Sequence, residues 1–104
     1  MNSELKEKID LFINDFLEVK EVKQYLLLKQ EITNSREIRE LENKLKRSQK
    51  NMALSLGTSL YEQNKNEYLE SKSKYDNHPL IVNFNIVQEE VGYLLKSFKE
   101  KLEN

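Results

Sequence analysis

Cysteine is absent from this sequence, and histidine occurs once. Without cysteine the chain has no disulfide, no thiolate zinc site and no cysteine-held iron–sulfur cluster, and one histidine does not complete an HExxH metal motif. Only two glycines and one proline occur in 104 residues. They leave too few turn residues for a β-sandwich or barrel, and no glycine-rich loop for phosphates. The composition excludes a Rossmann or P-loop enzyme, and we expect no metal and no cofactor.

An excess of either charge is also lacking, because 17 Lys and Arg face 18 Asp and Glu, a net charge of −1. The chain therefore has no long-range field that would attract nucleic acid or an anionic membrane. No stretch approaches the roughly 18 apolar residues of a membrane span, and the N-terminal segment has no apolar signal core. We expect a cytoplasmic protein with neither a membrane contact nor a small-molecule substrate.

Helix-forming residues are what the sequence has in abundance. Ala, Glu, Lys, Leu and Arg make up nearly half of the chain, and 34% of the residues are charged. Such usage is typical of long helices, and the hydrophobic content of 38% predicts a thin core. We predict an all-α fold in one domain, residues 1–104: an antiparallel bundle of four to five helices with a long C-terminal helix, which oligomerises.

Apolar residues recur at helical spacing in five segments, which we place at residues 3–19, 19–32, 35–56, 59–75 and 79–102. The first two form either one bent helix or two helices. Asn2 or Ser3 is predicted to cap the first helix, and Gly57 to end the third. Two helices are predicted to begin with capping boxes, in which Glu follows a polar residue by three positions; the pairs are Asn34–Glu37 and Ser59–Glu62.

The last helix gives the clearest pattern. His78, Pro79 and Leu80 form the predicted structural turn at its start, since proline suits a first helical turn and His78 is more plausibly a cap than a catalytic base. The core-facing residues of this helix fall within an arc of about 100°. We name them the seam: Leu80, Phe84, Val87, Val91, Leu94, Leu95, Phe98 and Leu102.

Val82, Ile86 and Tyr93 lie on nearly the opposite side of the same helix and form a second apolar stripe. A helix at the edge of a small monomeric bundle has no reason to carry two apolar sides. The second stripe is therefore a candidate oligomer interface. The alternative is that these three residues are scattered surface residues or contact the N-terminal helix.

The third segment has an apolar face that consists of Ile38, Leu41, Leu45, Met52 and Leu56. Opposite this face it carries five cations within an arc of about 100°. We name them the basic stripe: Arg36, Arg39, Lys46, Arg47 and Lys50. This surface could dock a protein partner, bind RNA phosphates, or be a plain solvated face. Likewise, Tyr61, Tyr68 and Tyr75 could stack bases or anchor a partner, or simply form the packed side of a helix.

Two stretches of the sequence resemble the YlbF/YmcA family of small all-helical bacterial proteins. One is the run from Tyr75 to Phe84 (YDNHPLIVNF), which is followed by Glu89-Glu90-Val91 and Leu94-Leu95. The other runs from Phe16 to Leu26 (FLEVKEVKQYL), ahead of the charged helix after Asn34. In order and spacing the resemblance spans nearly the whole chain.

The resemblance implies a noncatalytic regulatory adaptor, not an enzyme, that forms homodimers, higher oligomers or mixed oligomers with family paralogues. Such proteins act in a ribonuclease-associated complex that modulates RNA processing by ribonuclease Y, and through it competence, sporulation and biofilm formation. Some members hold an iron–sulfur cluster through cysteines that this chain does not have. Direct RNA binding by the basic stripe is the alternative function.

Overall fold

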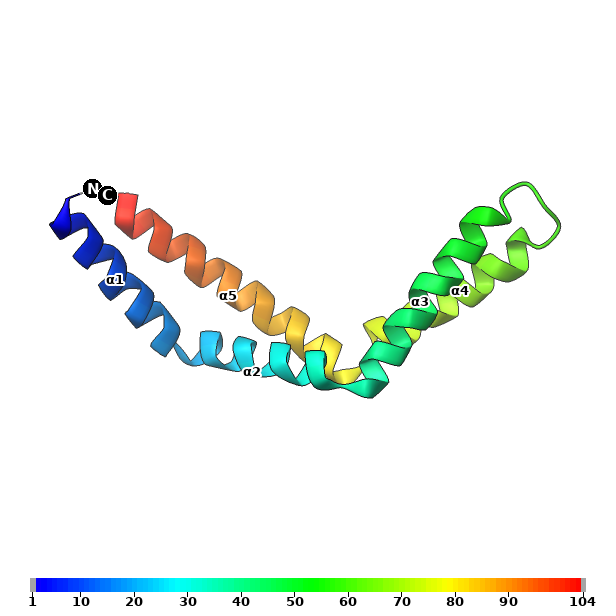
Figure 1. The fold of residues 1–104 in the computed structure, drawn as a ribbon, viewed down its shortest axis with the longest axis horizontal. Coiled ribbons are helices and arrows are strands. Elements are labelled where there is room, and N and C mark those ends of the chain that lie inside the picture. Colours follow the sequence, from blue (N-terminus) through cyan, green and yellow to red (C-terminus); the bar gives the residue numbers. More distant parts are fainter. Residues whose placement is uncertain (1, 104) are drawn as a thin grey trace. The chain divides into compact units, whose positions relative to one another are not determined.

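The computed structural model describes residues 2–103, and within them it contains five helices and no strand (Figure 1). The all-α prediction and the long last helix are confirmed. The elements, in chain order, are α1 (Ser3–Glu18), α2 (Lys20–Asn34), α3 (Arg36–Leu54), α4 (Tyr61–Asp76) and α5 (Pro79–Glu103).

The chain divides into two compact units. The first contains α1, α2 as far as Gln30, and α5 from Asn83 onward; the second runs from Glu31 to Val82 and contains α3 and α4. Each division falls inside a helix, α2 in one case and α5 in the other. That the whole chain is a single domain stays a prediction.

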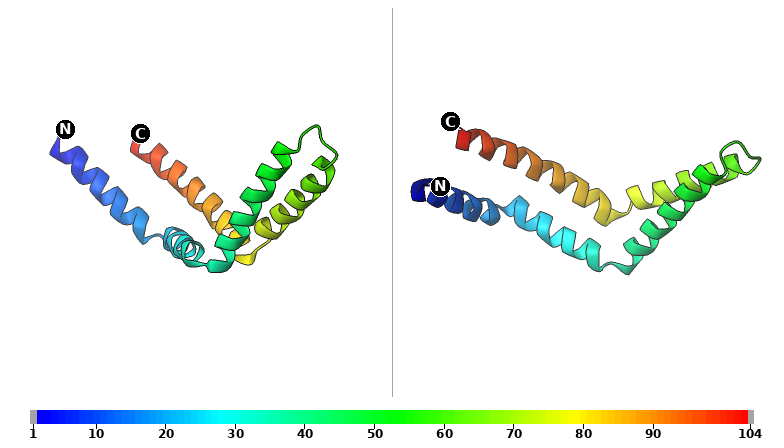
Figure 2. Two further views of the ribbon diagram at one scale, coloured as in Figure 1. Left: turned by 45° about the vertical axis from the view of Figure 1, so that its right-hand side comes forward. Right: turned by 45° about the horizontal axis from the view of Figure 1, so that its top comes forward.

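In the second unit α3 and α4 form an antiparallel hairpin, which is seen side by side in each view (Figures 1 and 2). Ile38 of α3 is its most buried apolar residue, with 1% of its surface exposed. Ser48 of α3 and Ser71 of α4 are also buried. Because the distance between two packed helices follows the size of the side chains at their contact, these serines suit a close approach of α3 and α4.

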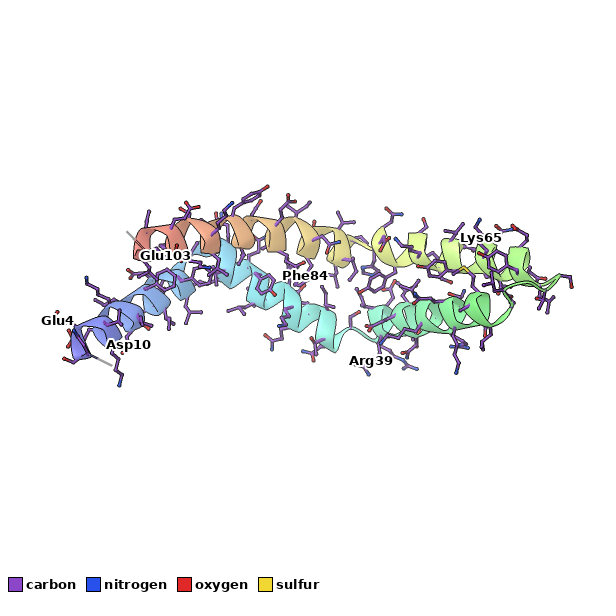
Figure 3. The ribbon with its side chains drawn as sticks, turned by 90° about the horizontal axis from the view of Figure 1, so that it is seen from above. Glu4, Asp10, Arg39, Lys65, Phe84 and Glu103 are labelled. Carbon is purple, nitrogen blue, oxygen red and sulfur yellow. The ribbon has the colours of Figure 1, made fainter. Side chains whose placement is uncertain are left out.

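In the first unit aromatic side chains join α5 to α1 and α2. The ring of Phe98 on α5 meets the rings of Phe12 and Phe16 on α1 at centroid distances of 5.3 and 5.9 Å. Further along α5, Phe84 stacks on Tyr25 of α2 at 5.2 Å, and Figure 3 shows Phe84 directed from α5 toward α2. These separations are those of favourable aromatic pairs. Ring contacts therefore connect α5 to both α1 and α2, beside the buried Val22 and Val87.

At two helix boundaries the structure decides between alternatives that the sequence left open. The side-chain oxygen of Asn2 accepts hydrogen bonds from the amides of Glu4 and Leu5, at 2.7 and 3.2 Å, and so caps α1. Val19 has an extended backbone, with φ −64° and ψ 134°, which leaves α1 and α2 as two separate helices. Of the two alternatives for this region, the structure has two helices and not one bent helix.

Both predicted capping boxes are wrong, by one residue each. Asn34 is still the last residue of α2, and the hydroxyl of Ser35 caps α3 by accepting from the Ile38 amide at 3.2 Å. At α4 the N-cap is Leu60, which makes no side-chain cap bond. There the loop is fixed instead by Thr58, whose hydroxyl donates to the Ser55 carbonyl at 2.6 Å and accepts from the Leu60 amide.

The end of α3 also differs from the prediction. The helix ends at Leu54 with Ser55 as its C-cap, so that Gly57 lies two residues beyond the cap. Gly57 has φ +82°, the left-handed conformation that glycine adopts without strain. Leu56, predicted to lie on the apolar face of the helix, is 72% exposed because the helix no longer directs it inward.

The seam on α5 is confirmed through most of its length and wrong at three positions. Leu80, Phe84, Val87, Val91, Leu94 and Phe98 are buried or half-buried, whereas Leu95 and Leu102 are 49% and 47% exposed. Ile81 was not assigned to the seam, yet only 4% of its surface is exposed. Ile81 belongs to the second unit, whereas α5 from Asn83 onward belongs to the first. The first turn of α5 therefore packs against different residues from those that contact the rest of the helix. The buried direction therefore changes along α5.

Candidate interaction surfaces

The structural turn before α5 is built around His78. The Leu80 amide donates a hydrogen bond to Nδ1 of His78 at 3.2 Å, so the imidazole caps α5, and Pro79 is the first helical residue. The other ring nitrogen, Nε2, lies 3.4 Å from a carboxylate oxygen of Glu37, and 14% of the His78 side chain is exposed. The lone pair of Nδ1 already accepts the Leu80 amide hydrogen, so this nitrogen is not free to accept a proton from a substrate. The geometry therefore gives His78 a structural role.

The basic stripe lies on the exposed side of α3, and all five of its residues are exposed. Figure 3 shows Arg39 on the side of α3 that faces away from α4. Arg36 pairs with Glu40 at 3.2 Å and Lys46 with Glu42 at 3.0 Å. Arg39, Arg47 and Lys50 form no ion pair with any residue in the described range. Three cations are thus left without an acidic partner in the second unit.

The second apolar stripe is exposed to solvent in the single chain. Val82, in the second unit, is 38% exposed, while Ile86 and Tyr93, in the first unit, are 52% and 68% exposed. None of the three therefore serves the core of its unit. Their assignment to an oligomer interface stays a prediction.

The tyrosines of α4 form the packed side of that helix. Tyr61, Tyr68 and Tyr75 are all half-buried on the side of α4 that also carries the buried Ser71. Burial raises the pKa of Tyr75 above its usual value, and the carboxylates of Glu42 and Asp76 raise it further. Of the readings open to this stripe, the structure favours packing over stacking on bases.

Two surface features are not predicted by the sequence pattern. One is the tip of the hairpin, where Leu54, Leu56 and Leu60 are 73%, 72% and 58% exposed. The sequence predicts a third helix that reaches Leu56 and directs this side chain inward. Because α3 ends at Leu54, the leucines of the tip are exposed instead. The other is a shallow groove in the first unit, which no periodicity in a single segment could reveal, because α2 and α5 both contribute to it.

That groove has a volume of about 330 Å³ and is lined by Glu21, Glu90, Tyr93 and Leu94. We name it the α2–α5 groove. Glu21 and Leu94 are half-buried, while Glu90 and Tyr93 are exposed. Neither Glu21 nor Glu90 forms an ion pair with a residue of the described part of the chain. The groove therefore combines an aliphatic wall, an aromatic ring and two carboxylates that form no ion pair with a described residue.

The described residues contain no cluster of three or more histidines and acids placed to hold a metal ion. Nor does any helix among them have the length and apolar character needed to cross a bilayer. What residues 2–103 do contain are surfaces: a basic one on α3, an apolar one on α5 and the α2–α5 groove. These features define the class, an all-helical protein with exposed basic and apolar surfaces.

The chain belongs to the YlbF/YmcA family. The sequence profile of that family, described as control of the competence regulator ComK, matches residues 5–104, essentially the whole chain. The resemblance seen in the two sequence stretches is thereby confirmed. This is a family of regulatory proteins and not a known enzyme family. Neither the comparison with curated proteins nor that with solved structures gave a match.

Proposed function

We propose that this protein is a noncatalytic regulatory adaptor that forms homo- or hetero-oligomers and modulates RNA processing by ribonuclease Y. The observation that carries the proposal is the match of residues 5–104 to a family that controls a competence regulator. The adaptor acts by docking: it changes what its partners do and makes or breaks no bond itself.

The thin core of the first unit supports oligomerisation. Among its described residues only Val22 and Val87 are buried apolar residues, whereas Ile86 and Tyr93 of α5 are more than half exposed. Small domains bury a modest share of their surface, and association with a partner stabilises them further by mass action. Fully burying one large apolar side chain contributes roughly 1.5–3 kcal/mol. Covering the exposed side of α5 is a direct way to add to this core.

Sedimentation velocity across a range of concentrations tests the oligomer. We expect the wild-type chain to associate as the concentration rises, and Ile86→Asp to weaken that association at least tenfold. Leu69→Asp on α4 is the matched control, because Leu69 is 49% exposed and Ile86 is 52% exposed. A wild-type chain that stays monomeric at all concentrations, or equal effects of the two variants, would reject α5 as the interface.

The adaptor role is tested with purified ribonuclease Y and a structured transcript. We expect the chain to cleave no RNA by itself and to change the rate or position of cleavage when it is added to the ribonuclease. Ile86→Asp should lose this effect, and Leu69→Asp should keep it. Unchanged cleavage in the presence of the wild-type chain and its family paralogues would contradict the adaptor role.

Direct RNA binding is the second candidate function, favoured by the three unpaired cations Arg39, Arg47 and Lys50. Neutralising three phosphates of a single strand gives a slope of about −2 in the logarithm of affinity against the logarithm of salt concentration. The triple variant Arg39→Glu, Arg47→Glu, Lys50→Glu should then abolish binding. RNA affinity that is unaffected by this variant removes the second candidate.

A further inference from the structure

We propose that the α2–α5 groove of one copy of the chain binds arginine side chains of the basic stripe on a second copy. The inference deepens the proposed function and rests on it, because it assumes that the chain associates with itself. It names a second contact, which shares Tyr93 with the second apolar stripe and adds the carboxylates of Glu21 and Glu90. It pairs a surface of the first unit with a surface of the second unit in another molecule.

The lining of the groove suits a guanidinium group. A carboxylate accepts two parallel hydrogen bonds from arginine, and the two acids come from different helices, Glu21 from α2 and Glu90 from α5. Tyr93 offers a ring on which a guanidinium stacks, and Leu94 offers an aliphatic wall for the methylene stem. At about 330 Å³ the groove is near the lower limit of small-ligand sites.

The chain itself carries cations that match this groove. Arg39 and Arg47 are both exposed on α3 and form no ion pair with a described residue. Arg47 also lines a pocket between α3 and α4 that contains Glu67 and Glu70. The two arginines are eight residues apart, or about 12 Å along a helix. The first unit has more acidic than basic residues, and the second has the reverse. Contact between unlike units of two copies therefore brings opposite charges together, whereas contact between like units does not.

Acidic residues next to the basic stripe on α3 make RNA a less suitable partner for it than a protein. Glu40 and Glu42 project beside it and already neutralise Arg36 and Lys46. Glu37 also lies in the first turn of α3. Interspersed carboxylates repel a continuous phosphate backbone, but they are compatible with a partner that presents two discrete carboxylates. Charge complementarity thus favours a protein surface such as the α2–α5 groove.

Charge reversal with complementation tests the pairing. The groove variant carries Glu21→Lys and Glu90→Lys, and the stripe variant carries Arg39→Glu and Arg47→Glu. None of these four side chains has an ion pair to lose, so helicity and thermal stability should stay near wild type. At low salt we expect each variant alone to associate at least tenfold more weakly than the wild type. An equimolar mixture should regain wild-type association, because each altered surface then meets one of opposite charge.

A third variant controls for net charge. Glu89→Lys with Glu100→Lys changes the net charge of the first unit by the same amount as the groove variant does, but outside the groove, and it should associate as the wild type does. The wild-type association should also weaken as salt rises, since three of the four charges in the contact, those of Glu90, Arg39 and Arg47, are exposed. Equal weakening by the control variant would assign the effect to net charge and overturn the inference.

Two other results would also overturn it. A mixture that does not regain association rejects the pairing of these surfaces. A stripe variant that loses RNA affinity but associates normally assigns the basic stripe to RNA instead. Either result is compatible with the proposed function if Ile86→Asp still dissociates the oligomer. A wild-type chain that is monomeric at all concentrations rejects both the proposed oligomer and the groove–stripe contact.

Discussion

Nε2 of His78 lies 3.4 Å from a carboxylate oxygen of Glu37, which links the loop before α5 to the first turn of α3. The same imidazole caps α5 through its other nitrogen. One side chain thus ties two helix N-termini of the second unit together.

His78→Ala removes the cap and this link at once. We expect it to lower the free energy of unfolding by about 1–2 kcal/mol, the usual range for loss of a helix cap. His78→Asn retains a side-chain oxygen that can accept from the Leu80 amide and should lose less than half as much. Urea denaturation at pH 7 and one fixed protein concentration measures both, and wild-type stability of His78→Ala would contradict the structural role.

Ile38 and Leu56 should respond in opposite ways to truncation. Ile38→Ala opens a cavity at a residue that is 1% exposed and should cost about 2–5 kcal/mol. Leu56→Ala alters a side chain that is 72% exposed and should stay within about 0.5 kcal/mol of wild type. Denaturant midpoints give the comparison directly. Similar losses from the two variants would place Leu56 in the core, as the sequence pattern predicted.

Phe84 and Tyr25 are expected to couple. Phe84→Ala should cost about 2–4 kcal/mol, somewhat below a fully buried phenylalanine, because Phe84 is half-buried. A double-mutant cycle with Tyr25→Ala should give a coupling energy of about 0.5–1.5 kcal/mol, since the rings stack at 5.2 Å. Additive effects of the two substitutions would show that α2 and α5 do not meet through these rings.

The two glycines form a matched pair. A Cβ atom at either position would meet no atom within 4 Å, so backbone conformation alone decides the outcome. Gly57→Ala forces alanine into a conformation with φ +82° and should cost about 1 kcal/mol. Gly92→Ala, inside α5, should stabilise the chain by about 0.5–1 kcal/mol. Thermal unfolding of both variants checks the opposite signs.

The raised pKa of Tyr75 predicts a stability change at alkaline pH. Because the folded state holds the phenol proton more tightly than the unfolded state, this stability is fully present below the unfolded pKa of about 10. It is lost as the pH rises through the higher pKa of the folded state. Absorbance titration of tyrosinate and urea denaturation at two alkaline pH values, with Tyr75→Phe for assignment, measure the effect. A variant with the same alkaline loss as wild type would exclude Tyr75 as its source.

Several features of the fold were predictable because they depend on local sequence. Apolar spacing located the five helical segments but left open whether the first two form one bent helix or two. The cap by Asn2 or Ser3 and the His78–Pro79 turn follow from the geometry of helix ends. The two capping boxes failed by one residue because Asn34–Glu37 and Ser59–Glu62 satisfy the same pattern as a true cap. The structure instead uses the hydroxyl of Ser35 at α3 and fixes the loop before α4 with that of Thr58.

Of the candidate surfaces, one is predictable from local sequence and one is not. The basic stripe follows from helical spacing alone, and the structure leaves it exposed as predicted. The α2–α5 groove does not follow from spacing, because Glu21 and Glu90 are far apart in the sequence and meet in one lining only after folding.

The sequence by itself determined the helices, the exclusion of cysteine chemistry, and the family to which the chain belongs, since propensity, periodicity and motif order are properties of neighbouring residues. Only the tertiary structure decided which side of each helix is covered. It buried Ile81, exposed Leu95 and left the leucines of the hairpin tip in solvent. The reason is physical: an apolar stripe marks a side that would gain from burial, but the element packed against it determines how wide that side is and where it ends.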